Sequence, residues 1–175
     1  MIKVVNNVLN IEDCFALYSA LIGSNIWKLN EGSFLDKQRG CFPRATFIHD
    51  GKIALNDQYW IGYFNCLFDR INSKLKEQHN FSMNRVIKRI ALNAQNDNHY
   101  TEFHSDSLGS DYSIVGFLTP QWSEDWGGEL NIEGETIKYN PGDFVIFEGA
   151  KLHKSQPIKK IPYWRLSINY VIEKK

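Results

Sequence analysis

The sequence predicts a mainly β fold with flanking helices, built on a double-stranded β-helix (jelly-roll) core. From residue 84 onward, apolar and polar residues alternate with a period of two in eight short segments. Gly, Pro, Asn and Asp separate these segments, and no helical period lies between them. Aromatic residues make up 14% of the chain, which favours β structure. Regularly spaced short strands of this kind are typical of jelly rolls.

Two helices and several short strands are expected in residues 1–83. The first helix covers residues 10–22, where Asn10 is a candidate N-cap and acidic residues follow in the first turn. The second helix covers residues 56–78. Its apolar residues at helical spacing are Trp60, Phe64, Leu67, Phe68, Ile71 and Leu75. Such a stripe is typical of a packing face, so we expect the helices to cover an outer face of one sheet.

The second half of the chain supplies the predicted core strands. They are residues 85–93, 101–105, 112–118, 129–133, 135–139, 143–147, 151–155 and 163–172. The turns between them include "QNDN", "SLGSD", "WGG", "EGE" and "NPGD". No internal repeat or low-complexity linker interrupts the sequence. We therefore expect one domain over residues 1–175, in which residues 1–83 support a core of residues 84–175.

The composition argues against several classes of partner. Twenty basic residues balance twenty acidic ones, and no basic cluster alternates with aromatic residues, so a nucleic-acid-binding role is not expected. Cys14, Cys41 and Cys66 form no CxxC pattern and are interpreted as free thiols in a reducing compartment. The start of the sequence has no signal-peptide pattern, and no apolar run is long enough to span a membrane. A cytoplasmic protein without membrane contact is therefore expected.

The segment "HSD" contains a candidate pair of metal ligands. Residues two apart on a strand point to the same face, so His104 and Asp106 are expected to project together. His153 follows a Pro-Gly turn and an apolar strand, and the second and seventh strands of a jelly roll can lie side by side. Two histidines and one carboxylate leave three metal positions open, as in non-haem Fe(II) oxygenases. The remaining histidines, His49, His79 and His99, are interpreted as solvated.

The last strand carries a second candidate group. Arg165 and Ser167 share one face, and Trp164 and Leu166 lie on the other. The arginine is either exposed on the solvent side or a carboxylate clamp inside the barrel. The strong apolarity of the strand favours the clamp.

The joint order and spacing of these residues resemble the iron and 2-oxoglutarate-dependent dioxygenase superfamily. The segments "FLTPQWSEDWGGELNI" and "NPGDFVIFEGAKLHKSQPI" are similar to its prolyl 4-hydroxylase-like branch. The resemblance covers residues 86–172. It implies that His104, Asp106 and His153 bind Fe(II), and that O2 and 2-oxoglutarate take the open positions.

The same resemblance implies how the cosubstrate is held. Arg165 would pair with the distal carboxylate of 2-oxoglutarate, with Ser167 beside it. Family members often use a tyrosine for the keto-acid end, but this strand has none, and Asn93, with Gln95 on the same face, is the nearest counterpart. Prolyl 4-hydroxylases commonly use a lysine clamp, so Arg165 argues against peptidyl proline as the substrate.

The implied reaction is hydroxylation of an unactivated C–H bond in a small molecule or an amino-acid or peptide substrate. Two other classes remain open: a cupin-like metal-dependent isomerase or lyase that does not use 2-oxoglutarate, and a non-enzymatic sugar- or peptide-binding jelly roll. Substrate recognition is expected in residues 24–60 and in loops 94–103 and 119–128. There, Arg39 and Arg44 are interpreted as solvated surface, with contact to an acidic group as the alternative. The aromatic residues near the site, Tyr100, Phe103, Trp122 and Trp126, are expected to serve mainly in packing.

Overall fold

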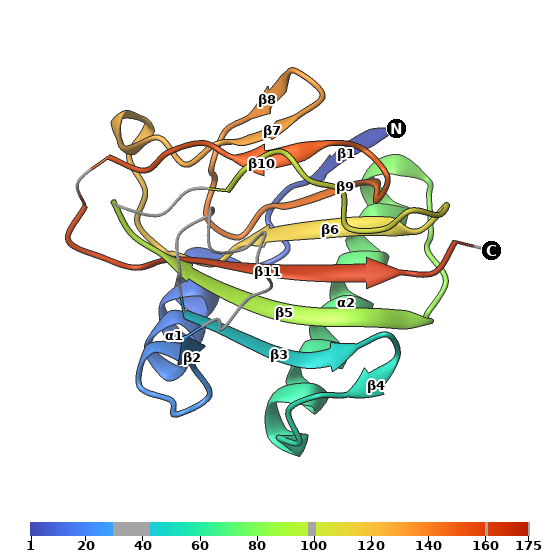
Figure 1. Ribbon diagram of the computed structural model, residues 1–175, viewed down its shortest axis with the longest axis horizontal. Coiled ribbons are helices and arrows are strands. Elements are labelled where there is room, and N and C mark those ends of the chain that lie inside the picture. The colour runs from blue at the N-terminus through green and yellow to red at the C-terminus, as the bar shows by residue number, and fades with distance from the viewer. Residues whose placement is uncertain (30–42, 98–100, 160, 175) are drawn as a thin grey trace.

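Among the residues that the structure describes, the fold consists of two antiparallel β-sheets, two α-helices and a short 3-10 helix, Glu124–Trp126 (Figure 1). The structure is a computed structural model that describes residues 1–29, 43–97, 101–159 and 161–174. The large sheet contains β1 (Ile2–Val5), β2 (Lys28–Leu29), β3 (Pro43–His49), β4 (Lys52–Ile53), β5 (Ile87–Gln95), β6 (Tyr112–Phe117), β9 (Phe144–Glu148) and β11 (Arg165–Ile172). The small sheet contains β7 (Leu130–Ile132), β8 (Glu135–Ile137) and β10 (His153–Ser155). The strand orders are β1-β9-β6-β11-β5-β3-β2, with β4 paired to β3, and β10-β7-β8.

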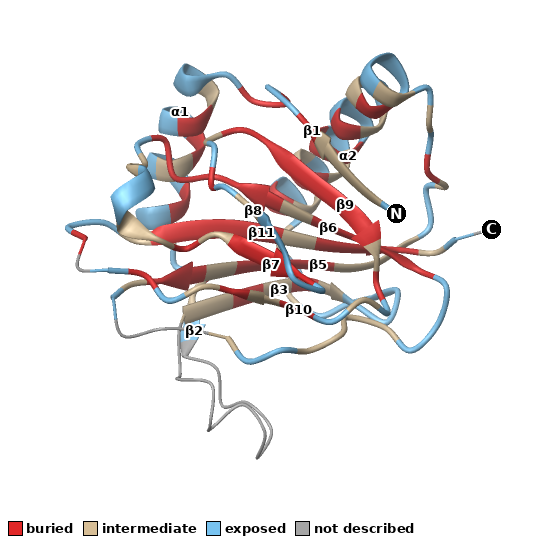
Figure 2. Cartoon of the chain, turned by 90° about the horizontal axis from the view of Figure 1, so that it is seen from above, coloured by how far each residue is buried: buried red, intermediate tan, exposed pale blue. Residues whose placement is uncertain are grey.

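Helices α1 (Ile11–Ile22) and α2 (Gln58–His79) cover one face of the large sheet (Figures 1 and 2). The Asn10 side chain accepts a hydrogen bond from the Asp13 N–H at 2.7 Å, as expected of an N-cap. Asp57 caps α2 through the Trp60 N–H at 3.2 Å. All six residues of the predicted apolar stripe on α2 are buried. The predicted helices and their packing role are confirmed.

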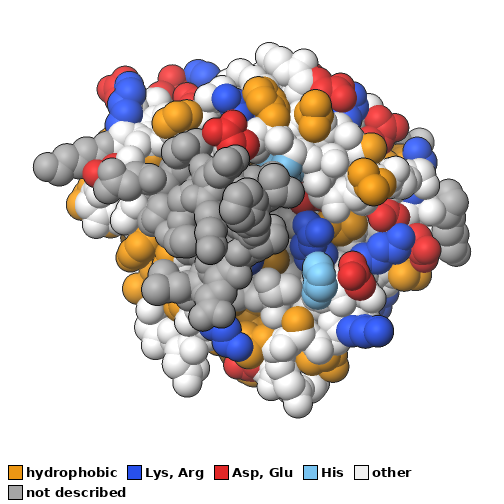
Figure 3. Space-filling model, in the orientation of Figure 1, with side chains coloured by type: hydrophobic (Ala, Val, Ile, Leu, Met, Phe, Trp, Pro, Cys, Tyr) orange, Lys and Arg blue, Asp and Glu red, His pale blue; other side chains and the backbone are white. Residues whose placement is uncertain are grey.

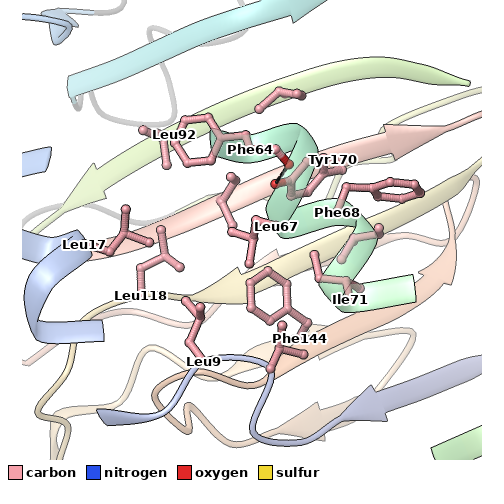
Figure 4. Packing of buried hydrophobic residues seen from close by; sticks show 14 of the residues in the cluster. Leu9, Leu17, Phe64, Leu67, Phe68, Ile71, Leu92, Leu118, Phe144 and Tyr170 are labelled. Atoms are coloured by element: carbon pink, nitrogen blue, oxygen red, sulfur yellow. Dashed lines mark hydrogen bonds between the residues drawn. The ribbon is translucent and has the colours of Figure 1, made fainter. Parts of the chain in front are cut away.

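The main core lies between the helices and the large sheet. Leu166, Ile168 and Tyr170 of β11 belong to the same buried cluster as Phe64 of α2 (Figure 4). The Tyr170 hydroxyl donates a hydrogen bond to the Phe64 carbonyl at 2.9 Å, which satisfies the polar end of a fully buried ring. This side of β11 is therefore apolar, and its alternate residues point to the opposite face of the sheet.

A second core joins the two sheets. Val145 and Phe147 of β9 pack with Leu130 and Ile132 of β7, whereas Phe144 belongs to the helix-side cluster. Because successive strand residues point to opposite faces, β9 contributes to both cores. The large sheet is therefore the middle layer, with the helices on one side and the small sheet on the other.

The predicted strand over residues 101–105 is wrong. Within this segment only His104 forms a bridge, with His153, and the two residues exchange N–H to carbonyl bonds of 3.0 and 2.9 Å. Beyond it, the N–H groups of Asp106 and Ser107 both donate to the Gly149 carbonyl, at 2.9 and 3.2 Å. Two successive N–H groups cannot share one acceptor in a regular ladder, so the strand ends. The other seven predicted segments each overlap a strand.

Within the described part of the chain, no helix is both long enough and apolar enough to cross a membrane.

Candidate active site

A cavity of about 530 Å³ lies between the two sheets. Its walls include alternate residues of the large sheet, with Arg89, Ala91, Asn93 and Gln95 from β5 and Arg165, Ser167 and Asn169 from β11. The segment 104–106 and strand β10 contribute to the other wall. The volume is in the range of small-molecule sites. The cavity therefore lies between the polar face of β11 and the two segments that contain His104 and His153.

His104, Asp106 and His153 meet in this cavity. One potential ligand atom from each residue lies within 4.8 Å of the other two. The backbone bridge aligns the two histidines, and their ring centroids are 4.3 Å apart. Asp106 Oδ2 lies 3.5 Å from His153 Nε2. The three side chains could therefore hold one metal ion.

Backbone contacts fix the orientation of both imidazoles. His104 Nδ1 lies 2.9 Å from the Glu102 carbonyl, and His153 Nδ1 lies 3.0 Å from the Lys151 carbonyl. A carbonyl only accepts hydrogen bonds, so Nδ1 carries the proton in each ring and the lone pair of the neutral ring is on Nε2. Metal-binding histidines are commonly oriented in this way.

Asp106 is held by three side chains. Its Oδ1 accepts from Arg89 Nη1 at 2.9 Å, and its Oδ2 accepts from Ser113 Oγ at 2.7 Å and Asn169 Nδ2 at 3.0 Å. Burial by itself raises the pKa of the Asp106 carboxyl, but the neighbouring His153, the Ser113 hydrogen bond and Arg89 together leave this pKa below its ordinary value. Asp106 is therefore available as a carboxylate, the form that binds metals.

Arg165 is the largest fully buried side chain among the described residues. Its Nη1 donates to Gln95 Oε1 at 2.7 Å, its Nη2 donates to the Gly128 carbonyl at 2.9 Å, and its Nε has no partner. The Glu129 carboxylate acts on Arg165 electrostatically and raises its pKa, but it is not among the hydrogen-bond partners of the guanidinium. Burial lowers the pKa of the guanidinium, but an arginine retains its charge in proteins. The cavity wall therefore contains a buried cation with neutral partners.

The surroundings of Arg165 explain the "WGG" segment. Gly128 has φ of +75°, and a Cβ there would lie 3.2 Å from Arg165 Nε and 3.0 Å from Trp122 Cζ2. Only glycine accommodates both this backbone conformation and this close approach. The Tyr139 ring lies 5.1 Å from the guanidinium carbon, and burial raises the pKa of Tyr139 to about 12, so it remains a neutral phenol. Both features position Arg165 without neutralising it.

Some of the other residues singled out in the sequence line the cavity, and others do not. Ser167 lines the cavity, as does Asn93, whose Oδ1 accepts from Arg44 Nε at 2.9 Å. His49 was expected to be solvated, and it is exposed but also lines the cavity. The described aromatic residues that flank the site do not line it: Trp122 packs against Tyr139, with ring centroids 4.4 Å apart and planes tilted by 32°. Arg39, Cys41, His99 and Tyr100 lie outside the described residues.

The sequence reasoning missed Arg89, Ser113 and Asn169, the three partners of Asp106. A signal for two of them is present in the sequence. Arg89 is two and four positions from Ala91 and Asn93, and Asn169 is two positions from Ser167, so alternation places them on the cavity face. Ser113 has no comparable signal, because its contact with Asp106 depends on a loop conformation that alternation does not describe.

The residues present fit the cofactors of a non-haem iron oxygenase. Two imidazoles and a carboxylate form a mixed nitrogen and oxygen set that suits Fe(II) and leaves further positions open. The buried Arg165, with its unpartnered Nε, suits an acidic organic ligand. Fold and site together define a jelly-roll protein with a candidate two-histidine, one-carboxylate metal centre.

The family follows from sequence comparison. A profile of the 2OG-Fe(II) oxygenase superfamily matches residues 86–173, which make up half of the chain. The chain therefore belongs to this superfamily, whose members use Fe(II), 2-oxoglutarate and O2, and it is a 2-oxoglutarate-dependent dioxygenase. This membership confirms the resemblance seen in the sequence and decides against the cupin-like and non-enzymatic alternatives. A search of curated proteins finds no match to the sequence.

Solved structures confirm the jelly-roll fold. An oxidoreductase of the 2OG-Fe(II) oxygenase family from Burkholderia pseudomallei is 15% identical, with a TM-score of 0.72 over 97% of this chain and 84% of that chain. A prolyl-4-hydroxylase from Pseudomonas putida is 13% identical, with a TM-score of 0.69 over 99% and 92%. A Trichoplax adhaerens prolyl hydroxylase, solved with a hypoxia inducible factor peptide fragment, is 16% identical, with a TM-score of 0.68 over 99% and 83%.

Proposed function

We propose that this dioxygenase hydroxylates an unactivated C–H bond of a small molecule or an amino-acid or peptide substrate. One oxygen atom of O2 enters the substrate and the other enters succinate, as 2-oxoglutarate loses CO2. His104, Asp106 and His153 hold Fe(II), and Arg165 binds the distal carboxylate of 2-oxoglutarate. Ser167 lies beside that carboxylate, and Asn93 contacts the keto-acid end.

The buried Arg165 is the single observation that carries this proposal. Desolvating a cation is costly, and its partners, Gln95, Gly128 and Tyr139, bear no charge. A dicarboxylate that enters the cavity supplies the missing negative charge, so the site is arranged to favour an acidic cosubstrate. Gln95 keeps the guanidinium in place, because its amide oxygen accepts from Nη1 at 2.7 Å.

The metal supplies the chemistry of O2 activation when it is bound. The role of the chain is to present its ligands in a fixed geometry. Hydrogen bonds from Nδ1 to backbone carbonyls keep Nε2 of His104 and His153 directed towards one point, and Arg89, Ser113 and Asn169 prevent rotation of the Asp106 carboxylate.

Asp106 also bears on the kind of product. Its carboxylate occupies the third metal position that the protein supplies. A halide therefore finds no metal position that the protein has left empty for it. We therefore expect the product to gain oxygen rather than chlorine, even in concentrated chloride.

The experiment is a screen of candidate substrates with the iron-loaded enzyme, with and without chloride. Succinate formation is measured together with the mass of the product, and reactions without 2-oxoglutarate are the control. We expect succinate to rise together with a mass gain of one oxygen atom. A chlorinated product, or conversion of a substrate without succinate, would contradict the proposal.

A further inference from the structure

The cavity has a metal end and a clamp end, which is the end that contains Arg165. At the metal end, Asn169 of β11 donates to Asp106 at 3.0 Å, and Arg165 lies four residues earlier on the same strand. Strand β10 contributes to the opposite wall, where His153 belongs to the metal end and Ser155 lies two residues further on. Figure 3 shows the side of the large sheet away from the helices, with histidine and Lys or Arg side chains close together near its middle.

Gln95 links Ser155 to Arg165 across the clamp end. Arg165 Nη1 donates to Gln95 Oε1 at 2.7 Å, and a guanidinium only donates, so the amide oxygen of Gln95 must face it. The amide nitrogen then donates to Ser155 Oγ at 3.5 Å, a long hydrogen bond. Both residues are buried, with Gln95 2% and Ser155 8% exposed. The Ser155 hydroxyl therefore belongs to the clamp end and acts as an acceptor towards Gln95.

Thr101 makes two contacts with Ser155. Thr101 Oγ1 accepts from the Ser155 N–H at 2.8 Å and lies 3.1 Å from Ser155 Oγ. Only one of the two hydroxyl protons can lie between these two oxygen atoms. The other hydroxyl proton has no acceptor among the residues that the structure describes. Both residues line the cavity, so this second proton is available to a ligand.

We propose that Ser155 supplies this proton and donates a hydrogen bond to the distal carboxylate of 2-oxoglutarate. The inference rests on the proposed function, in which Arg165 binds the same carboxylate from the other wall. Thr101 Oγ1 already accepts the Ser155 N–H, so the proton between the two oxygen atoms is assigned to Thr101. Ser155 Oγ then accepts from Thr101 and Gln95 and directs its own proton into the cavity. Thr101 is thus a positioning residue for Ser155.

A hydroxyl donor complements Arg165 at this end of the cavity. Two nitrogen atoms of the guanidinium already donate to Gln95 and to the Gly128 carbonyl, and Nε has no partner. A carboxylate has two oxygen atoms and about four positions for hydrogen bonds, more than one partly engaged guanidinium can fill. Hydrogen bonds to an ionised acceptor are also stronger than those between neutral groups. The distal carboxylate is therefore held between β11 of the large sheet and β10 of the small sheet.

The experiment compares two 2-oxo acids that differ only at the distal end. 2-Oxoglutarate has a carboxylate there, and 2-oxopentanoate has a methyl group. Both acids are titrated into Mn(II)-loaded protein by calorimetry without O2, so that binding rather than turnover is measured. The variants are Ser155→Ala, Thr101→Val and Thr101→Ser. Thr136→Val is the matched control, because Thr136 is exposed on β8 of the same small sheet and does not line the cavity.

Ser155→Ala should weaken 2-oxoglutarate binding by roughly 10- to 100-fold, the usual effect of losing a hydrogen bond to a charged group. Its affinity for 2-oxopentanoate should stay the same, because this acid offers the hydroxyl no distal acceptor. Thr101→Val should weaken 2-oxoglutarate binding selectively and to a smaller extent, and Thr101→Ser should restore it. Thr136→Val should bind both acids as the unaltered protein does.

Unaltered 2-oxoglutarate affinity in Ser155→Ala would overturn the inference. Equal losses for the two acids would overturn it as well, because they indicate a structural effect. If Ser155→Ala does not fold, the comparison of Thr101→Val with Thr101→Ser decides by the same criterion.

The unaltered protein tests the proposed function separately. A clamp formed by Arg165 requires that this protein binds 2-oxoglutarate more tightly than 2-oxopentanoate. Absence of that preference contradicts the proposed function. A preference that Ser155→Ala leaves intact contradicts only the role of Ser155.

Discussion

At the scale of single residues, backbone carbonyls and neighbouring side chains prepare the candidate ligands for a metal. The Nδ1 atoms of His104 and His153 are both within 3.0 Å of a carbonyl oxygen, and Asp106 accepts from three side chains. Fixed tautomers and a low carboxyl pKa mean that the ligands need no rearrangement when the ion arrives. Two predictions test this description.

The first prediction concerns the ligands themselves. The unaltered protein should bind one Fe(II) per chain, and His104→Ala or His153→Ala should abolish stoichiometric binding, since each change removes one of three ligands. Iron content after anaerobic loading and gel filtration is the measurement. His79→Gln is the control, because His79 contacts the Val4 carbonyl rather than the cavity. Full iron content in both alanine variants would refute the ligand set.

The second prediction concerns Arg89, which donates to both Asp106 Oδ1 and, at 3.4 Å, the Asp106 carbonyl. Arg89→Gln should weaken metal affinity by roughly 10- to 100-fold, the usual effect of removing a group that orients a ligand. Competition with a chelator gives the affinity. Arg85→Gln, at an exposed position four residues earlier, is the matched control and should match the unaltered protein. Equal affinities in the two variants would show that Arg89 does not position Asp106.

At the scale of elements, each strand of the site separates an apolar face from a polar one. On β11, Leu166, Ile168 and Tyr170 pack against the helix-side core, while Arg165 and Ser167 line the cavity. The same strand therefore contributes both to stability and to the site. Its register against β5, in which Arg165 lies opposite Gln95, sets the hydrogen bond between those two side chains.

Helix α2 provides a stability prediction at this scale. Phe64 is fully buried, and its ring lies 5.2 Å from that of Phe47 and 5.6 Å from that of Trp60. Phe64→Ala should lower the free energy of unfolding by about 3–5 kcal/mol, because it leaves a cavity in a packed core. Tyr59→Ala on the same helix is the control, since Tyr59 is 70% exposed and should change stability by less than about 0.5 kcal/mol. Urea unfolding measures both, and similar losses would contradict the packing assignment.

Periodicity in the sequence was sufficient to predict the helices, most strands and the cavity face of β11. The helical spacing of Trp60, Phe64 and Leu75 identifies a packing face because that spacing depends only on local geometry. Residues 101–105 could not be assigned in the same way. Their conformation depends on the Gly149 carbonyl, which lies more than forty residues away in the sequence and accepts from both Asp106 and Ser107.

The site shows the same limit. Alternation predicts which residues of one strand share a face, but not which strand lies beside it. The neighbouring positions of β3 and β5, which bring Arg44 to Asn93, and the β-bulge between Thr46 and Ile48 that redirects His49 arise from pairing between distant segments. Local sequence does not show such a pairing, so the sequence alone predicts a solvated position for His49 and, for Arg44, a solvated position or contact with an acidic group.

At the scale of the whole molecule, two cores isolate a buried cation from water. Helices cover one face of the large sheet and the small sheet covers part of the other, so Arg165 is only 1% exposed although it bears a charge. Its neutral hydrogen-bond partners satisfy two of its nitrogen atoms, and burial lowers its pKa more than Tyr139 and Glu129 raise it. The architecture therefore favours a negatively charged ligand beside Arg165, and we propose that this ligand is 2-oxoglutarate.

The central claim is that Arg165 binds 2-oxoglutarate beside a metal held by His104, Asp106 and His153. Removing one partner of a buried, hydrogen-bonded charge pair costs roughly 3–5 kcal/mol, and each decade of affinity corresponds to about 1.4 kcal/mol. Arg165→Ala should therefore weaken apparent 2-oxoglutarate affinity on the order of a hundred- to a thousandfold or more. Arg165→Lys should be impaired to a smaller extent, because an ammonium group cannot reproduce two parallel hydrogen bonds.

The measurement is a 2-oxoglutarate titration of succinate formation in the unaltered enzyme and both variants, with iron content determined on the same samples. The account predicts a large loss of 2-oxoglutarate affinity in Arg165→Ala, a smaller loss in Arg165→Lys, and unchanged iron content in both, since Arg165 is not a metal ligand. An Arg165→Ala enzyme whose succinate formation depends on 2-oxoglutarate as in the unaltered enzyme would contradict the account.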